Sequence, residues 1–202
     1  MHLRRCGRDA VLVEVDSLSE VAAVRAALHA AALPNLLELV PAARTVLISV
    51  HPGTDLTPVR RVLDTVDLTR PAETTSREIR IPVHYDGPDL ALVAETAGLT
   101  EAEVVALHSG TTYEVAFCGF APGFGYLTGL PEPLRQPRLD SPRTKVPAGS
   151  VAIAGEFTAA YPRATPGGWR LLGHTDTTLF DPRRPEPALL APGDRVRFEV
   201  AG

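Results

Sequence analysis

The first 80 residues of this sequence contain no phenylalanine, tyrosine or tryptophan, and only two of its sixteen glycines. All eleven aromatic residues lie in 81–202, together with fourteen of the nineteen prolines. A single hydrophobic core rarely draws its aromatic residues, glycines and prolines so unevenly from the chain. A length of 202 residues also suffices for two small domains. We therefore expect two domains, over residues 1–80 and 81–202.

Lysine is almost absent: Lys145 is the only one among twenty basic residues, and the formal net charge is −4. Proteins that bind nucleic acids usually carry a basic patch or stripe. The first 80 residues instead hold ten arginines against ten acidic residues. We expect no nucleic-acid partner.

Long apolar runs and cysteine clusters are also missing. No stretch approaches the ~18 consecutive apolar residues of a membrane span, and Glu14 and Asp16 interrupt the apolar residues behind the basic start. The two cysteines, Cys6 and Cys118, make neither a disulfide framework nor a metal cluster. These features predict a cytoplasmic protein with reduced thiols, no membrane segment and no bound metal.

Strand and helix patterns alternate through the first domain. Ser17 and Glu20 form a capping-box pattern, and Thr57-Pro58 places a proline at a first helical position, so a helix is expected after each. Strand patterns cover residues 10–15, 36–40, 45–50 and 77–83. The resulting β-α-β-β-α-β order is typical of an α+β, ferredoxin-like domain. It carries no recognisable catalytic group, and we expect a scaffold or docking unit.

Short strands dominate the second domain after an initial helical region. Residues 88–109 predict two helices, the first ending at Gly98 and the second opening at Thr100. Beyond them, short apolar segments alternate with Pro/Gly turns. This pattern is typical of a mainly-β closed barrel or sandwich.

A loop rich in glycine and aromatic residues lies at 117–129. Glycine allows close approach of the backbone to a ligand, so Gly123, Phe124 and Tyr126 are candidates for the wall of a substrate site. A tightly packed barrel corner explains the same residues equally well. The glycine spacing does not match a dinucleotide loop, and no G-x-x-x-x-G-K-[ST] phosphate loop is present.

Two further segments supply charged and titratable candidates. Arg143 and Lys145 lie in a basic stretch, and such groups bind carboxylates or phosphates and stabilise negative charge. A solvated basic loop is the alternative. Tyr161 and Trp169 could shape a pocket or pack in the core. His174 is a candidate base, with Asp176 two positions further on as an acid that would orient it; no G-x-S-x-G nucleophile elbow is present.

Four longer motifs resemble those of one protein family. They read GFAPGFGYL over 119–127, SPRTKVPAGSVAIAG over 141–155, YPRATPGGW over 161–169, and LFDP with LLAPGDRVRF between 179 and 198. Over its whole length the chain is similar to the carboxyltransferase-domain family that includes the B subunit of 5-oxoprolinase. That family has also been labelled allophanate hydrolase subunit 1, and it contains a sporulation-kinase inhibitor.

The resemblance implies a fold and an activity. It implies a small α+β first domain and a cyclophilin-like β-barrel as the second. Such proteins work beside a larger C subunit and a separate A subunit, and the complex uses ATP to hydrolyse 5-oxoproline, a cyclic amide, to glutamate. The chain would then be one component of a heteromeric hydrolase, inactive alone. Whether ATP touches this component is left open.

Two positions depart from the family pattern. Phe157 stands where a glutamine is usual, and His174 where an arginine is usual. Because a histidine is neutral half or more of the time near pH 7, contact with an anionic substrate would differ at these positions or be left to the partner.

Two other functions stay open on the sequence. The same family resemblance allows a regulatory module that docks its barrel on a sensor histidine kinase and inhibits it. A cyclophilin-like barrel also suggests prolyl isomerase activity, but only by analogy of fold. A neighbouring gene for a protein like the larger C subunit would favour the enzyme.

Overall fold

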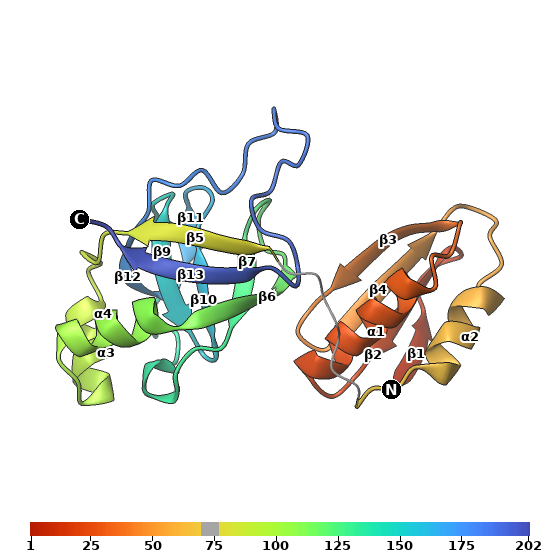
Figure 1. Cartoon of the computed structure of the whole chain (residues 1–202), viewed down its shortest axis with the longest axis horizontal. Helices are drawn as coiled ribbons and strands as arrows, with labels where there is room; N and C mark the ends of the chain where they lie inside the picture. The colour runs from red at the N-terminus through yellow and green to blue at the C-terminus, as the bar shows by residue number, and fades with distance from the viewer. Residues whose placement is uncertain (70–76) are drawn as a thin grey trace. The chain divides into compact units, whose positions relative to one another are not determined.

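The structure is a computed structural model that describes residues 1–69 and 77–202. The chain divides into two compact units, residues 1–75 and 76–202 (Figure 1). The boundary expected at residue 80 lies too late, because it would cut strand β5 (Glu78–Val83), which belongs to the second unit. No helix among the described residues is long and apolar enough to cross a bilayer.

The first unit is a four-stranded antiparallel sheet covered on one face by two helices (Figure 1). Its strands lie in the order β1 (His2–Arg5), β2 (Ala10–Glu14), β4 (Thr45–Val50) and β3 (Leu36–Pro41), and its helices are α1 (Leu18–Ala30) and α2 (Thr57–Thr65). Alternate residues of the central strands, such as Val13 and Ile48, are buried in one apolar cluster with Leu28 of α1 and Leu63 of α2. This packing follows from the period-2 and period-3.6 patterns of the sequence.

The expected ferredoxin-like strand order is not confirmed. Residues 77–83, expected as the last strand of this sheet, instead contribute β5 to the sheet of the second unit. The place beside β2 is taken by β1, in which Leu3 pairs with Val13. All four residues of β1 are exposed, so it lacks the alternation of apolar and polar residues that marks a half-buried strand in a sequence.

The second unit is built on a seven-stranded sheet that curls into an almost closed barrel (Figure 1). Along the sheet lie β12 (Arg170–His174), β9 (Ser150–Ala154), β10 (Phe157–Ala160), β7 (Gly125–Thr128), β6 (Thr112–Cys118), β13 (Arg195–Val200) and β5. Neighbouring strands are antiparallel except β13 and β5, which are parallel. The unit also contains helices α3 (Leu90–Ala97) and α4 (Glu101–Gly110), the short 3₁₀ helix η1 (Glu132–Leu134), and the paired strands β8 (Arg143–Val146) and β11 (Thr165–Gly167).

The two edge strands of this sheet meet at a seam. His84, directly after β5, exchanges two backbone hydrogen bonds with His174 at the end of β12, with N···O distances of 2.8 and 2.9 Å. Glycine is required on both sides of the seam. A Cβ at Gly87 would lie 2.3 Å from the carbonyl oxygen of Leu171, and one at Gly173 would lie 2.1 Å from that of His84. The two edges of the sheet thus come together where glycines leave no side chain between the backbones, as expected for a barrel.

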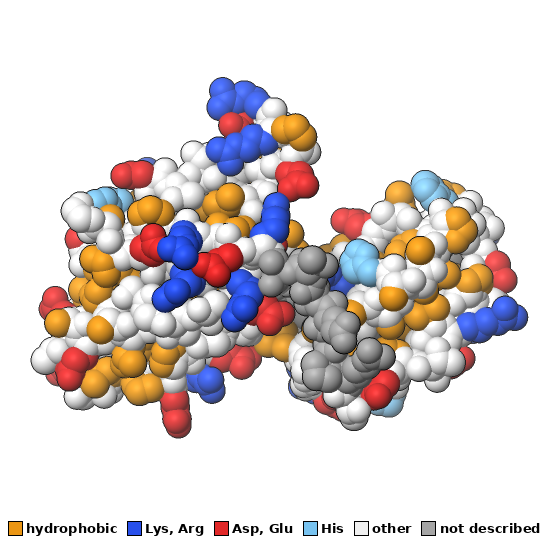
Figure 2. Space-filling view, viewed as in Figure 1, with side chains coloured by type: hydrophobic (Ala, Val, Ile, Leu, Met, Phe, Trp, Pro, Cys, Tyr) orange, Lys and Arg blue, Asp and Glu red, His pale blue; other side chains and the backbone are white. Residues whose placement is uncertain are grey.

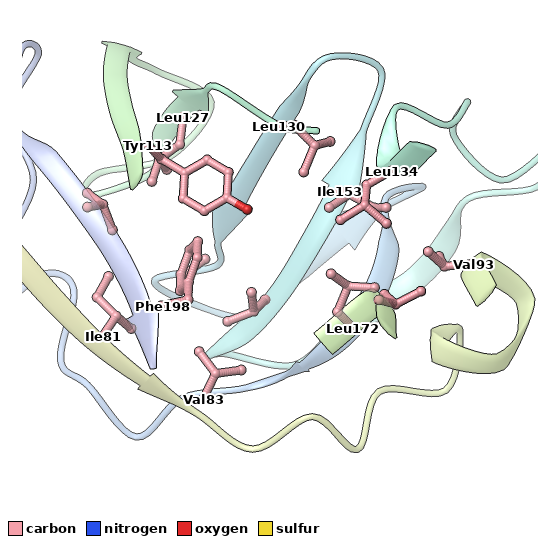
Figure 3. Packing of buried hydrophobic residues seen from close by; sticks show 14 of the residues in the cluster. Ile81, Val83, Val93, Tyr113, Leu127, Leu130, Leu134, Ile153, Leu172 and Phe198 are labelled. Atoms are coloured by element: carbon pink, nitrogen blue, oxygen red, sulfur yellow. The ribbon is translucent and has the colours of Figure 1, made fainter. Parts of the chain in front are cut away.

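The interior of the barrel is filled by one apolar cluster (Figure 3). Ile81, Tyr113, Leu127, Ile153 and Phe198 come from five different strands, and each is exposed by 1% or less. Side chains packed this closely leave the ends and the outer surface of the barrel for functional groups.

A histidine side chain lies inside this core. His108 of α4 is fully buried, with its Nδ1 2.8 Å from the Tyr85 hydroxyl and its Nε2 2.9 Å from Thr158 Oγ1. Thr158 donates its proton to the carbonyl oxygen of Ala152, so it accepts from Nε2–H, and Nδ1 accepts from Tyr85. Burial lowers the pKa of His108 to about 3, which keeps the ring neutral.

Charges of both signs are mixed on the face of the second unit seen in Figure 2. Over β5 and β13, Arg80 pairs with Glu78 at 3.2 Å and with Glu199 at 3.0 Å. Basic side chains on this face thus lie beside acidic ones.

Candidate functional site

A cavity of about 420 Å³ opens beside the seam. It is lined by the 86–88 loop after β5, by β8, by the 147–150 turn into β9, and by the end of β12. Arg143, Lys145 and His174, the three candidates predicted to be catalytic, all line it. The barrel therefore brings together two separate sequence segments at one candidate site.

Arg143 is fixed in this cavity by a buried carboxylate. Its Nη2 donates to Asp89 Oδ1 at 2.7 Å, and the other oxygen of Asp89 accepts from the backbone N–H of Leu171, also at 2.7 Å. The Asp89 side chain is only 7% exposed. Asp89 thus ties β8 to β12 and offsets the charge of Arg143.

Lys145 differs from Arg143 because its ammonium group has no ion-pair or hydrogen-bond partner among the described residues. Alternate residues of a strand point to the same face, which places Lys145 on the cavity side of β8 together with Arg143. Lys145 therefore offers the cavity a cation that no carboxylate of residues 1–69 and 77–202 offsets.

His174 is oriented by Asp86, and not by Asp176 as the sequence spacing suggested. Its Nδ1 lies 2.8 Å from Asp86 Oδ1, and the hydrogen bond from His174 holds the pKa of Asp86 below its usual range. An ionised carboxylate only accepts, so Nδ1 carries the proton and the Nε2 of the neutral ring has a free lone pair. The ring also stacks on His84, with centroids 5.1 Å apart.

The five residues predicted to bind substrate do not line this cavity. Phe124, Tyr161 and Trp169 are buried in a second apolar cluster, with Tyr126 packed against it. Gly123 has a φ of +82°, and a Cβ there would lie 2.7 Å from Phe180 Cβ. Burial also raises the pKa of Tyr161 to about 12. These residues thus pack together at a corner of the barrel, and their role in substrate binding stays a prediction.

The two departures from the family pattern lie in different places. His174 lines the cavity, whereas Phe157 packs edge-on against Phe117 and Tyr126 in the aromatic cluster. Of these two residues, only His174 therefore contributes to the chemistry of the cavity.

The sequence reasoning missed three polar residues of the site, Asp86, Asp89 and Ser150. Two of them lie in the run His84-Tyr85-Asp86-Gly87-Pro88-Asp89, where two acidic residues flank a Gly-Pro turn directly after a strand. That placement is a usable signal, because functional residues gather on loops held by a rigid scaffold. The described residues contain no cluster of three or more His, Cys, Asp or Glu that could hold a metal.

The chain thus belongs to a class of proteins in which an α+β unit precedes an almost closed barrel with a cationic cavity. Comparison with known proteins identifies the family. Residues 1–190 match the family model described as carboxyltransferase domain, subdomain C and D, and the chain belongs to that family. Among curated relatives, the B subunit of 5-oxoprolinase from Escherichia coli O157:H7 is 45% identical over 210 residues, which cover 98% of this chain and 96% of that protein.

Solved structures show the same fold in chains of different length. The protein TTHA0988 is 38% identical with a TM-score of 0.82, and the match covers 100% of this chain but 40% of that one. PH0987 from Pyrococcus horikoshii is 33% identical with a TM-score of 0.60, and the match covers 99% of this chain and 97% of that one. The fold therefore occurs both as nearly a whole chain and as part of a longer one.

Proposed function

We propose that this chain is the B subunit of a cytoplasmic, heteromeric 5-oxoprolinase that hydrolyses 5-oxoproline to glutamate with ATP. The main observation in support is the 45% identity to the B subunit of a 5-oxoprolinase along nearly the full length of both proteins. The relatives favour this function, as one component of an enzyme, over the regulatory kinase inhibitor.

The cavity supports the proposal chemically. When the amide carbonyl of a lactam is attacked, negative charge develops on its oxygen, and a cation beside that oxygen stabilises the charge. Lys145 is suited to this role because its charge is unpaired among the described residues. Arg143, held by Asp89, would serve mainly to shape the site.

ATP fits this cavity poorly. A triphosphate needs several cations or a loop of free backbone N–H groups, whereas Arg143 is already paired with Asp89 and the sequence has no phosphate loop. We therefore assign ATP to the complex rather than to this cavity.

A larger partner of the C-subunit type, with a separate A subunit, completes the proposed enzyme, and this chain alone would not turn over 5-oxoproline. The length of one solved relative supports a role beside a further domain or subunit, since this chain spans only 40% of TTHA0988. We take the first unit, which lines none of the described cavity, as the scaffold or docking part.

The test is co-purification with the larger C subunit, with the A subunit added, followed by ATP-dependent turnover of 5-oxoproline and of allophanate. We expect 5-oxoproline turnover by the complex and none by this chain alone. Arg143→Ala should lower turnover, whereas Arg163→Ala, which removes an exposed arginine outside the cavity, should not. Turnover of neither substrate would contradict the proposal, and wild-type turnover with Arg143→Ala would remove Arg143 from the site.

A further inference from the structure

We propose that Ser150, His174 and Asp86 form a nucleophilic relay that gives this chain an acyl-transfer activity of its own. The substrates would be esters whose acyl chain carries a carboxylate. This activity needs neither ATP nor a partner, and it does not rest on the proposed function.

Strand pairing places Ser150 directly opposite His174. The two residues are register partners on the antiparallel strands β9 and β12, and both line the cavity. The backbone N–H and carbonyl of His174 both bond to His84, and the carbonyl of Ser150 accepts from Tyr161 N–H. The backbones of Ser150 and His174 therefore form a non-hydrogen-bonded pair. In such pairs the opposing side chains come closest, with Cβ atoms about 4.5–5.5 Å apart.

The hydroxyl of Ser150 is available for reaction. The residue is 4% exposed and lines the cavity, and its Oγ makes no hydrogen bond among the described residues, so its bond to His174 Nε2 is one that forms when a substrate binds. It is also not one of the fully buried polar atoms that lack a partner, so the Oγ opens onto the cavity. A hydroxyl beside an imidazole that can take its proton is the arrangement in which a serine becomes nucleophilic.

His174 is prepared to take the serine proton. Asp86 holds Nδ1–H at 2.8 Å, and stacking on His84 further restricts the ring. The Nε2 lone pair is therefore the basic atom, and Asp86 acts as a positioning residue that also stabilises the imidazolium. Besides Asp86, the charged groups that share the cavity with this ring are Arg143, offset by Asp89, and Lys145.

The reaction proceeds in two balanced steps. Ser150 Oγ bonds to the acyl carbon as the ester C–O bond breaks, and the Oγ proton passes through Nε2 to the departing alcohol oxygen. Water then attacks the acyl-serine and gives a proton to Nε2; the C–Oγ bond breaks, the proton passes from Nε2 to Oγ, and the acid is released. Lys145 selects acyl chains that end in a carboxylate, because it is the cation of this cavity whose charge no described carboxylate offsets.

The first test is covalent labelling of the full-length chain. A fluorophosphonate probe should form an adduct on Ser150, located by peptide mass spectrometry, and Ser150→Ala should abolish the adduct. Hydrolysis of mono-4-nitrophenyl glutarate should exceed that of the neutral ester 4-nitrophenyl butyrate, and Lys145→Gln should remove this preference. An adduct elsewhere, or unchanged hydrolysis with folded Ser150→Ala, would overturn the proposal whether or not the complex turns over 5-oxoproline.

The role of Asp86 is tested by a matched pair of carboxylates. Asp86→Asn should lower hydrolysis about tenfold, which is less than the 10²–10⁴-fold typical for loss of the general base itself. It should also move the acidic limb of the pH–rate profile to lower pH, because a negative neighbour of the imidazolium is lost. Asp176→Asn removes an acid outside the cavity and should change neither. Equal pH profiles for Asp86→Asn and the wild type would refute the positioning role.

Discussion

Lys145 and Arg143 are two residues apart on one strand, yet their different surroundings give one a functional role and the other a structural role. Arg143 is paired with the buried Asp89, whereas Lys145 has no partner among the described residues. A paired arginine contributes to the architecture of the site, and an unpaired, exposed lysine contributes little to stability. Substitution of Arg143 should therefore affect stability, whereas substitution of Lys145 should affect activity alone.

Substitution of Lys145 tests this separation. Lys145→Gln should lower kcat/KM of the 5-oxoprolinase complex about tenfold, as expected for the loss of one charge-assisted hydrogen bond, with an unchanged Tm. Lys145→Arg keeps the charge and should restore part of the activity. A fall in Tm with Lys145→Gln would show that the lysine has a structural partner and would contradict this assignment.

The sequence predicted the cations of the site but not their partners. Arg143, Lys145 and His174 stand out because their residue types suit anion binding and proton transfer. The partner of His174 could not be read from spacing, because Asp86 lies 88 positions away and reaches it only when the barrel closes. Asp176, the local alternative, lies outside the cavity that His174 lines.

At the level of elements, the local patterns were reliable and their assembly was not. Thr100 and Glu103 form the full capping box of α4, and Gly98 ends α3 in the left-handed conformation, as their residue types predict. Strand β5 was also expected nearly where it occurs. Its assignment to the first unit was wrong, because a strand pattern indicates which face is buried but not which sheet the strand joins.

The seam between β5 and β12 should be intolerant of even a methyl group. Gly173→Ala would place its Cβ 2.1 Å from the carbonyl oxygen of His84, and we expect a loss of about 3 kcal/mol in the free energy of unfolding, as for overpacked sites. Because the same contact holds His174 beside Asp86, catalysis should fall as well. Urea denaturation measures the stability change.

Gly110→Ala is the matched control for the seam, since a Cβ at the end of α4 meets nothing within 4 Å. It should leave stability unchanged or raise it slightly, because alanine favours helix over glycine. Equal stability of the Gly173→Ala and Gly110→Ala proteins would show that the seam is not tightly closed.

For the whole molecule, the buried His108 makes stability depend on pH. The unfolded chain takes up a proton on this histidine below about pH 6.5, whereas the folded chain resists until about pH 3. The unfolded state thus binds more protons between these values, so His108 should make stability fall as the pH falls from about 6.5 to 3, by up to about 1.4 kcal/mol per pH unit. The free energy of unfolding, followed by the fluorescence of Trp169, measures this slope.

Matched histidine variants identify the source of that slope. Trp169 is the only tryptophan of the chain and lies in the same unit as His108, so its fluorescence reports the unfolding of that unit. His108→Gln should flatten the pH dependence, although it lowers stability at neutral pH, whereas substitution of the exposed His29 in the first unit should leave the slope unchanged. An unaltered slope in His108→Gln would assign the pH dependence to other groups.

The closure at His84 and His174 also has a consequence for how the chain folds. Joining positions so far apart in sequence costs loop entropy that is recovered only when the barrel core is formed. The seam should therefore be among the last contacts to form, and the Asp86–His174 pair with it. A partly folded chain would hold Arg143 and Lys145 on a local strand but would lack the base, so chemistry at this cavity is available only to molecules that have finished folding.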